Sequence, residues 1–131
     1  MVKSSGGFTY LDKGQGKPII LLHGLMGGVE NFGDMVDFIS HEYRVYGLDL
    51  KLFETPYLKC SVKNKAEYLL KFMNHLKIEK ATLLGNSMGG HIGLIFTKMY
   101  SDKVDSLIPV SYTHLRAHET SLHLVCRLLL E

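Results

Sequence analysis

The sequence predicts an α/β protein with a mostly parallel sheet, and two observations lead to this class. Between residues 8 and 108, short β-rich apolar runs alternate with segments of helical periodicity. Such alternation indicates βαβ units with right-handed crossovers. In addition, the sequence GNSMG at residues 85–89 stands directly between one such run and one such helix, the context of a sharp turn that exposes a serine. With 131 residues the chain forms one domain at most.

Composition narrows the class further. Hydrophobic residues make up 46% and charged residues 21%, as in ordinary soluble globular proteins. The net charge of +2 comes without a basic block, so we expect no nucleic-acid partner. No apolar run before residue 110 could span a bilayer, and the N-terminus has no secretory h-region. Cys60 and Cys126 lie far apart without metal-ligand spacing, so we expect a cytoplasmic protein without a disulfide framework or a metal site.

The first half of the chain predicts three strands and a helix. FTYLD, residues 8–12, alternates and closes at the Gly/Pro turn KGQGKP. IILLH, residues 19–23, is a continuous apolar run typical of a buried parallel strand. Residues 43–50, YRVYGLDL, form a second buried strand. Between them, residues 29–40 carry apolar side chains at helical spacing, namely Phe32, Met35, Val36 and Ile39.

The second half continues the alternation. Residues 62–78 predict an amphipathic helix. Its apolar face would consist of Ala66, Leu69, Leu70, Met73, Leu76 and Ile78. A further strand is expected over residues 81–87, a helix over 88–102, and the start of another strand over 104–108.

The GNSMG turn carries the chemistry. A serine on a tight strand-to-helix turn adopts positive φ, so we expect this strained conformation at Ser87. Side chains two residues to either side would collide, and Gly85 and Gly89 leave that space free. The following helix directs its free N–H groups and the positive end of its dipole at the serine.

A second glycine-rich loop, HGLMGG, follows the strand at residues 19–23. Such a loop can direct a backbone N–H at the serine. The N–H groups of Leu25 and Met88 would then form a two-donor oxyanion hole, each donor contributing about 3–4 kcal/mol of transition-state stabilisation. His23 and Gly24 are expected to shape the loop.

Together these segments resemble the α/β-hydrolase family over residues 8–108. The resemblance rests on PIILLHGLMGG, YRVYGLDL and LLGNSMGG, in that order. It implies a nucleophile elbow with Ser87 as the nucleophile, Leu25 and Met88 as oxyanion donors, a small-molecule substrate and no cofactor. KLFETP replaces the P-G-x-G or R-G-x-G loop that follows Asp49's strand in many members, so their substrate preferences are not transferred.

In that family an acid and then a histidine follow the serine. His91 lies in the same helix as Ser87, and we expect a packing or rim residue. His23 is expected to be structural, and Asp49 to cap a loop. The remaining polar candidates are interpreted as surface or incidental residues: His41, His75, Asp102, Asp105 and Cys60. The tail offers His114, His118, Glu119 and His123, with metal-like i, i+4 spacing between the first two.

The tail, however, does not fit the pattern. Pro109 stands where a central parallel strand needs an N–H, and YTHLRAHET shows neither helical nor strand periodicity. PVSYTHLRAHET resembles the in-frame translation of a transposase-based sequencing adapter, and residues 124–131 match the end of the same adapter. We therefore interpret 1–108 as the N-terminal part of an α/β-hydrolase domain. Residues 109–131 are interpreted as adapter read-through without native structure.

The expected function is that of a serine hydrolase acting on carboxylic esters through an acyl-enzyme. The chain itself is expected to be truncated and inactive, since loss of triad partners costs about 10⁴ to 10⁶ in turnover. The alternatives are a C–C bond hydrolase, a cofactor-free haloperoxidase, or a non-catalytic small-molecule binding protein. A fourth reading, a serine in an ordinary turn, would be favoured by negative φ at Ser87. Substrate and oligomeric state stay open.

Overall fold

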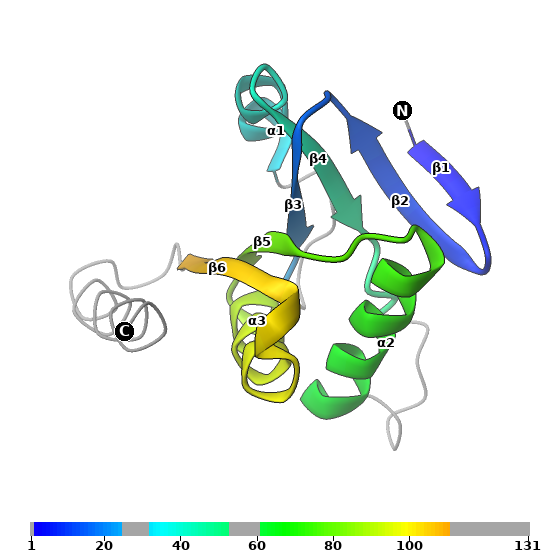
Figure 1. Cartoon of the computed structure of the whole chain (residues 1–131), viewed down its shortest axis with the longest axis vertical. Helices are drawn as coiled ribbons and strands as arrows, with labels where there is room; N and C mark the ends of the chain where they lie inside the picture. The colour runs from blue at the N-terminus through cyan, green and yellow to red at the C-terminus, as the bar shows by residue number, and fades with distance from the viewer. Residues whose placement is uncertain (1, 25–31, 53–60, 111–131) are drawn as a thin grey trace.

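The computed structural model describes residues 2–24, 32–52 and 61–110. They fold as an α/β structure built on one sheet (Figure 1), which confirms the predicted fold class. In chain order the elements are β1 (Val2–Ser5), β2 (Phe8–Lys13), β3 (Lys17–Leu22), α1 (Gly33–Ile39), β4 (Tyr43–Leu48), α2 (Val62–His75), β5 (Ala81–Asn86), α3 (Met88–Met99), the 3₁₀ turn η3 (Ser101–Lys103) and β6 (Val104–Val110).

The strand order is β1-β2-β4-β3-β5-β6. The β4–β3, β3–β5 and β5–β6 pairs are parallel, whereas β1–β2 and β2–β4 are antiparallel. The sheet is therefore mostly parallel, as predicted. Leu22 of β3 pairs with Gly85 of β5, so the segments that leave these two strands emerge side by side. Ligand sites in open α/β sheets form at such carboxyl ends.

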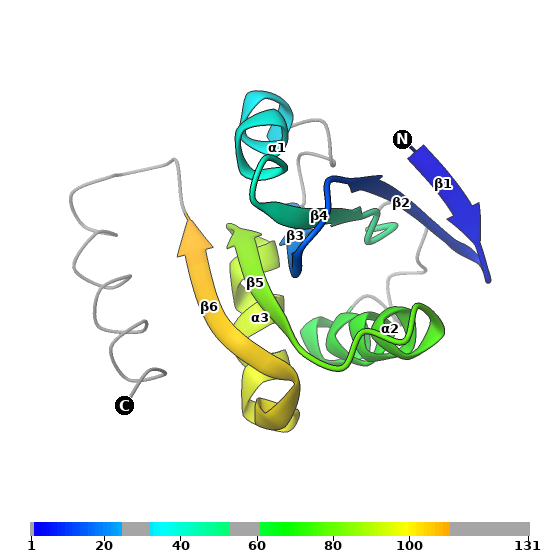
Figure 2. The same cartoon turned by 45° about the horizontal axis from the view of Figure 1, so that its top comes forward.

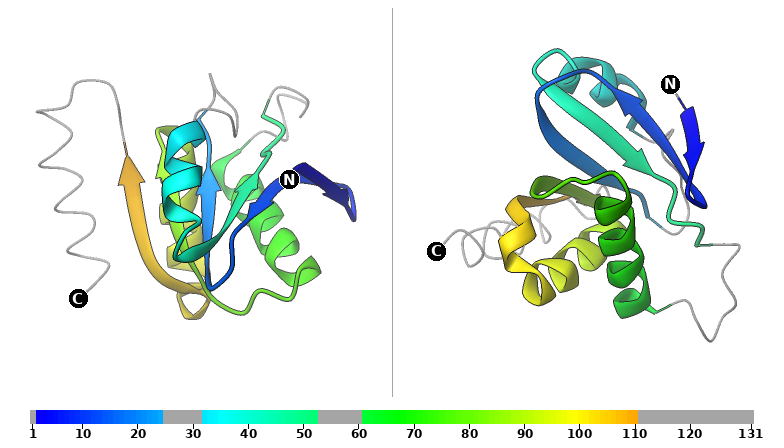
Figure 3. Two further views of the ribbon diagram at one scale, coloured as in Figure 1. Left: turned by 90° about the horizontal axis from the view of Figure 1, so that it is seen from above. Right: turned by 45° about the vertical axis from the view of Figure 1, so that its right-hand side comes forward.

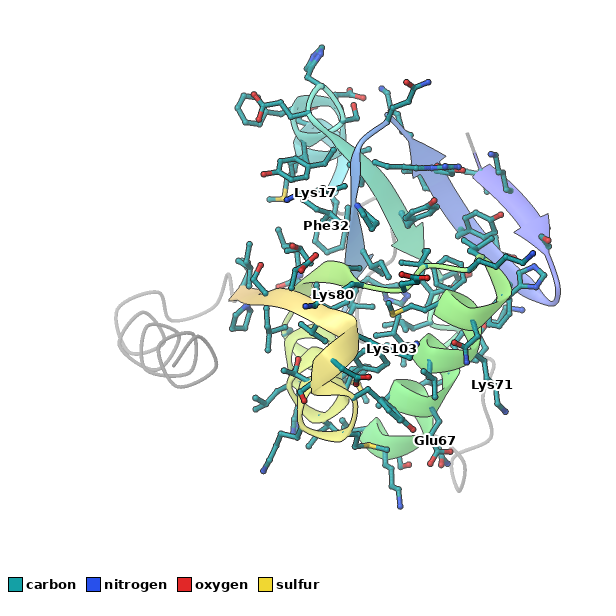
Figure 4. The ribbon with its side chains drawn as sticks, in the orientation of Figure 1. Lys17, Phe32, Glu67, Lys71, Lys80 and Lys103 are labelled. Atoms are coloured by element: carbon teal, nitrogen blue, oxygen red, sulfur yellow. The ribbon has the colours of Figure 1, made fainter. Side chains whose placement is uncertain are left out.

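Helices cover the two faces of the sheet unequally. α1 lies on one face, and α2 and α3 lie on the other (Figures 1, 2 and 3). The α1 side holds a small apolar cluster in which Phe32 and Val36 pack with Leu21, Val45 and Leu84; Phe32 is labelled in Figure 4. The opposite face holds the larger cluster, which includes apolar residues from α2 and α3.

α2 confirms its amphipathic prediction but also buries two residues outside the expected apolar face, Lys65 and Phe72. Ala66, Leu69 and Met73 are fully buried. Phe72, which is absent from the expected apolar face, is also fully buried. Its ring contacts those of Phe8, Tyr10 and Tyr46. Glu67 and Lys71 are labelled on this helix in Figure 4.

The last strand corrects one expectation. β6 continues through Pro109 to Val110, so the proline does not break the strand. The expectation assumed a central strand, whereas β6 is outermost in the described sheet. Val110 pairs with Asn86 and its carbonyl accepts the Ser87 N–H. Since polar groups alternate between the two sides of a strand, the nitrogen of Pro109 faces away from β5 and no ladder bond is lost. Residues 111–131 lie outside the described residues, and a domain boundary at residue 108 stays a prediction.

Candidate active site

Ser87 occupies the turn between β5 and α3. Its backbone has φ 55° and ψ −116°, so the predicted positive φ is confirmed. This region is costly for any residue with a side chain and persists only when the surroundings impose it. The side chain is exposed. An ordinary turn with negative φ is therefore excluded at this position.

The glycines on either side of Ser87 are required by contact. A Cβ built on Gly85 would lie 2.5 Å from the carbonyl carbon and oxygen of Gly89. A Cβ built on Gly89 would lie 2.0 Å from the carbonyl oxygen of Leu22. Both distances are far inside van der Waals contact, so the expected steric role of these glycines is confirmed.

The segment that leaves β3 reaches the serine. A Cβ on Gly24 would lie 3.3 Å from Ser87 Cβ and 3.8 Å from Ser87 Oγ. From the other side, the Ser87 N–H donates to the Val110 carbonyl at 2.9 Å. Among residues 2–24, 32–52 and 61–110, the Ser87 hydroxyl has no hydrogen-bond partner. The serine is thus held through its main chain, with Gly24 beside its side chain.

His23 is buried behind this contact, with 3% of its surface exposed. Its Nδ1 lies 2.9 Å from the Gly24 carbonyl oxygen, and the Leu50 N–H lies 2.9 Å from its Nε2. Both ring nitrogens are therefore bonded to main-chain groups. The expectation that His23 plays a structural role agrees with these contacts.

Asp49 caps a turn, as expected. Its Oδ1 accepts the Lys51 N–H at 2.9 Å and lies 3.6 Å from His23 Nε2. Lys51 itself has φ 53°, and its ammonium donates to the Gly7 carbonyl oxygen at 2.9 Å. The end of β4 is thereby tied both to His23 and to the turn between β1 and β2.

The other polar candidates stand apart from Ser87. His91 is exposed on α3, and only its backbone N–H bonds to the Ser87 carbonyl, at 3.2 Å. His75 is exposed and lies 2.8 Å from the Ser5 hydroxyl. Asp105 pairs at 3.8 Å with Lys80, which is labelled in Figure 4. Asp102 and His41 are exposed.

Of the two expected oxyanion donors, Met88 lies among the described residues and Leu25 does not. Met88 is the first residue of α3, where a backbone N–H has no intrahelical partner, and its side chain packs partly buried against the larger cluster. Leu25 lies outside the described residues, as do Cys60 and the tail histidines. No helix in the described ranges is long and apolar enough to cross a membrane.

Two groups at the site escaped the sequence reasoning. The Leu50 N–H binds His23, and the Val110 carbonyl binds the Ser87 N–H. Both are main-chain groups whose role depends on which strands are neighbours. Side-chain identity carries no signal for them.

Sequence comparison identifies the protein family to which this fold and the turn at Ser87 belong. The sequence model of the alpha/beta hydrolase fold matches residues 17–124, a range that includes both the HGLMGG loop and the GNSMG turn. The chain therefore belongs to the α/β-hydrolase family. The matched range runs past residue 108, and the adapter interpretation beyond that residue is not tested by it.

Similar proteins include hydrolases of two kinds. A 2-hydroxy-6-oxo-6-(2'-aminophenyl)hexa-2,4-dienoic acid hydrolase from Metapseudomonas resinovorans is 30% identical over 76% of this chain and 37% of its own length. Esterase YbfF from Escherichia coli strain K12 is 30% identical over 78% of this chain and 42% of its own length. The chain thus spans about two fifths of the length of these relatives.

Solved structures give the same picture. MGS-MChE2, an α/β-hydrolase enzyme from the metagenome of sediments from the lagoon of Mar Chica in Morocco, superposes with a TM-score of 0.80 and is 38% identical, covering 98% of this chain and 62% of that enzyme. The meta-cleavage product hydrolase from Pseudomonas fluorescens IP01 superposes with a TM-score of 0.69 at 27% identity, over 82% of this chain and 43% of that one.

Proposed function

We propose that Ser87 is the nucleophile of a serine hydrolase that acts on small carboxylic esters through an acyl-enzyme. The observation that carries the proposal is the exposed serine at φ 55° between β5 and α3, with Gly24 beside its Oγ. A strained, exposed serine at the carboxyl end of a parallel sheet is the arrangement that presents Oγ to a carbonyl group.

The proposed reaction has two stages. Ser87 Oγ bonds to the ester carbonyl carbon while its proton passes to a base, and the carbonyl oxygen becomes an oxyanion. The N–H groups of Leu25 and Met88 stabilise that charge. Collapse of the intermediate breaks the ester C–O bond while the protonated base gives its proton to the leaving oxygen, so the alcohol is released and acyl-Ser87 remains. Water then hydrolyses the acyl-enzyme and restores the Ser87 hydroxyl. We assign the base and its carboxylate to sequence beyond residue 108, following the order serine, acid, histidine.

The relatives support hydrolysis as the reaction and point to two candidate substrate classes. Similarity to Esterase YbfF favours esters. Similarity to the dienoic acid hydrolase and to the meta-cleavage product hydrolase favours C–C bond hydrolysis as the second candidate. The two reactions differ in the bond that breaks after the carbonyl is attacked, so a paired assay separates them.

The proposal is tested by re-amplifying the locus from source DNA and reading past the codon for Ile108. We expect a longer frame that encodes an acidic loop followed by a histidine. The protein from that frame should hydrolyse p-nitrophenyl esters of short acids, and mass spectrometry should find the acyl group on the peptide that contains Ser87. The Ser87→Ala variant should do neither.

Two outcomes would reject parts of this proposal. Turnover by Ser87→Ala at the unmodified rate would exclude Ser87 as nucleophile. Turnover of a meta-cleavage product without ester hydrolysis would replace the ester class by the C–C class. We also propose that residues 1–131 alone hydrolyse no ester, and measurable turnover by that chain would contradict the assignment of base and acid beyond residue 108.

A further inference from the structure

We propose that the end of β6 positions the nucleophile: Ser87 keeps its strained conformation only while Val110 is paired with β5. Pairing of this strand end and presentation of the serine hydroxyl are then a single event. The link between β6 and Ser87 has a catalytic meaning only if Ser87 acts as proposed above. The conformational change itself is independent of any reaction.

The Ser87 main chain is hydrogen-bonded at both of its ends. Its N–H donates to the Val110 carbonyl oxygen at 2.9 Å, and its own carbonyl accepts the His91 N–H at 3.2 Å. The bond from His91 is the first bond of α3, which forms wherever a helix begins. The bond to Val110 joins the elbow to a different strand, so this bond depends on the tertiary fold.

The bond to Val110 depends in turn on the backbone conformation of Ser87. The angle φ describes rotation about the bond between the Ser87 nitrogen and Cα, and its value here is 55°. If α3 stays in place, a change of φ to the favoured negative region swings the Ser87 N–H away from its acceptor. Because positive φ is costly for a serine, loss of the acceptor would allow this strain to relax.

Side-chain packing holds the end of β6 in the position that this bond requires. A Cβ on Gly90 would lie 3.3 Å from Pro109 Cβ, and a Cβ on Gly93 would lie 2.7 Å from Leu107 Cδ1. Leu107 and Pro109 are two residues apart, so they lie on the same face of β6. The strand end is thereby seated on the helix that follows Ser87, which fixes the Val110 carbonyl relative to the elbow.

Two neighbouring residues of β6 direct their main-chain groups to opposite sides, which allows a matched test. Val110 faces β5, because its carbonyl accepts the Ser87 N–H, whereas Pro109 faces away from β5. Val110→Pro would therefore remove an N–H from the ladder with β5. Combining it with Pro109→Val moves the proline by one position at constant composition. Pro109→Val alone is the control, since it adds an N–H on the outer side only.

The experiment is NMR on the full chain labelled with ¹⁵N and ¹³C. A residue at positive φ gives a strong nuclear Overhauser effect between its own amide and Hα protons, because these protons lie closer together than at negative φ. The unaltered chain and Pro109→Val should show this strong effect and a protected amide at Ser87. In the double variant the effect should weaken, and the Ser87 amide should exchange about tenfold faster. The amide of Leu83, which lies earlier in β5, should stay protected in all three chains.

A strong effect at Ser87 in the double variant would overturn the proposed link, as would an equal loss in the Pro109→Val control. If the double variant does not fold, the unaltered chain still decides. A scalar coupling should then be observed across the hydrogen bond between the Ser87 nitrogen and the Val110 carbonyl carbon, and its absence would reject the link. None of these measurements needs a reaction at Ser87. Failure of the proposed hydrolysis and failure of the link between β6 and Ser87 are therefore read out separately.

Discussion

Gly89 and Leu22 approach so closely that a Cβ on Gly89 would lie 2.0 Å from the Leu22 carbonyl oxygen. The contact joins the first turn of α3 to the last residue of β3. It brings the elbow against the strand from which the HGLMGG loop leaves. A glycine at position 89 is therefore needed for the elbow to pack against β3, because any side chain there would push the two apart.

Replacing Gly89 by Ala should lower the free energy of unfolding by about 3 kcal/mol or prevent folding, because neither neighbouring backbone can yield without distortion. Gly33→Ala is the matched control. A Cβ on Gly33 meets nothing within 4 Å, so alanine in this helical position should raise stability by up to about 1 kcal/mol. Urea unfolding of both variants checks the contrast, and equal midpoints would show that the contact is not rigid.

Lys77 follows the C-terminal end of α2 and has a left-handed backbone conformation, which glycine adopts with less strain than lysine. Its φ is 57°, and the Ile78 N–H bonds to the Met73 carbonyl while the Lys77 N–H bonds to that of Asn74, the pair of bonds that defines a Schellman motif. Lys77→Gly should therefore stabilise the protein by about 0.5–1 kcal/mol. Lys77→Ala removes the charge but keeps the strain, so it should show no such gain. A gain of the same size from alanine in thermal unfolding would assign the effect to charge instead.

Sequence patterns predicted the elements of the fold well where burial follows a regular period. The strands around residues 19–23 and 81–87 and the helix from residue 62 were each found close to their expected bounds. β1 was missed because its four residues are all exposed, so it has no apolar alternation to detect. Phe72 was missed because α2 packs against α3 and also places the Phe72 ring against those of Phe8, Tyr10 and Tyr46, so it buries a wider face than one stripe.

The site was predicted to the extent that it depends on local chain geometry. Positive φ at Ser87 and the room left by its glycines follow from the turn itself. The hydrogen bond from Leu50 to His23 depends on the long-range pairing of β3 with β4. Pro109 was misjudged for a related reason, since its effect depends on which side of the strand faces a neighbour.

Asp12 makes stability depend on pH. Arg44 donates to both of its oxygens, at 3.0 and 2.9 Å, and Lys3 donates at 2.8 Å. The hydrogen bonds from Arg44, followed by the one from Lys3, lower the pKa of Asp12 to about 2 against the opposing effect of burial. The carboxylate joins β1, β2 and β4, because its partners lie on the two strands that flank its own.

The folded pKa of Asp12 is below the unfolded value, so its stabilisation is present above pH 4 and is lost as the pH falls towards 2. It should amount to about 2 kcal/mol at neutral pH. Asp12→Asn should lose that amount at pH 7 and converge with the unaltered chain near pH 2. In Asp105→Asn, which disturbs only the partly exposed pair with Lys80, the change should stay below about 0.5 kcal/mol. Parallel stability curves for Asp12→Asn and the unaltered chain across this range would refute the assignment.

The backbone conformation of Ser87 should lower the stability of the fold while it exposes the hydroxyl for reaction. At φ 55° and ψ −116° its backbone is strained at a cost of about 1–3 kcal/mol, and glycine would relieve most of that strain. Ser87→Gly should therefore raise the free energy of unfolding by about 1 kcal/mol, whereas Ser87→Ala, which keeps a Cβ, should leave it nearly unchanged. Both variants lack the hydroxyl, so under the proposed function neither should form an acyl-enzyme. Urea unfolding measures the first effect and mass spectrometry of the acylated peptide measures the second. If glycine and alanine gave equal stability, the turn would carry no strain, and the positive φ of the serine would no longer support a site maintained for its chemistry.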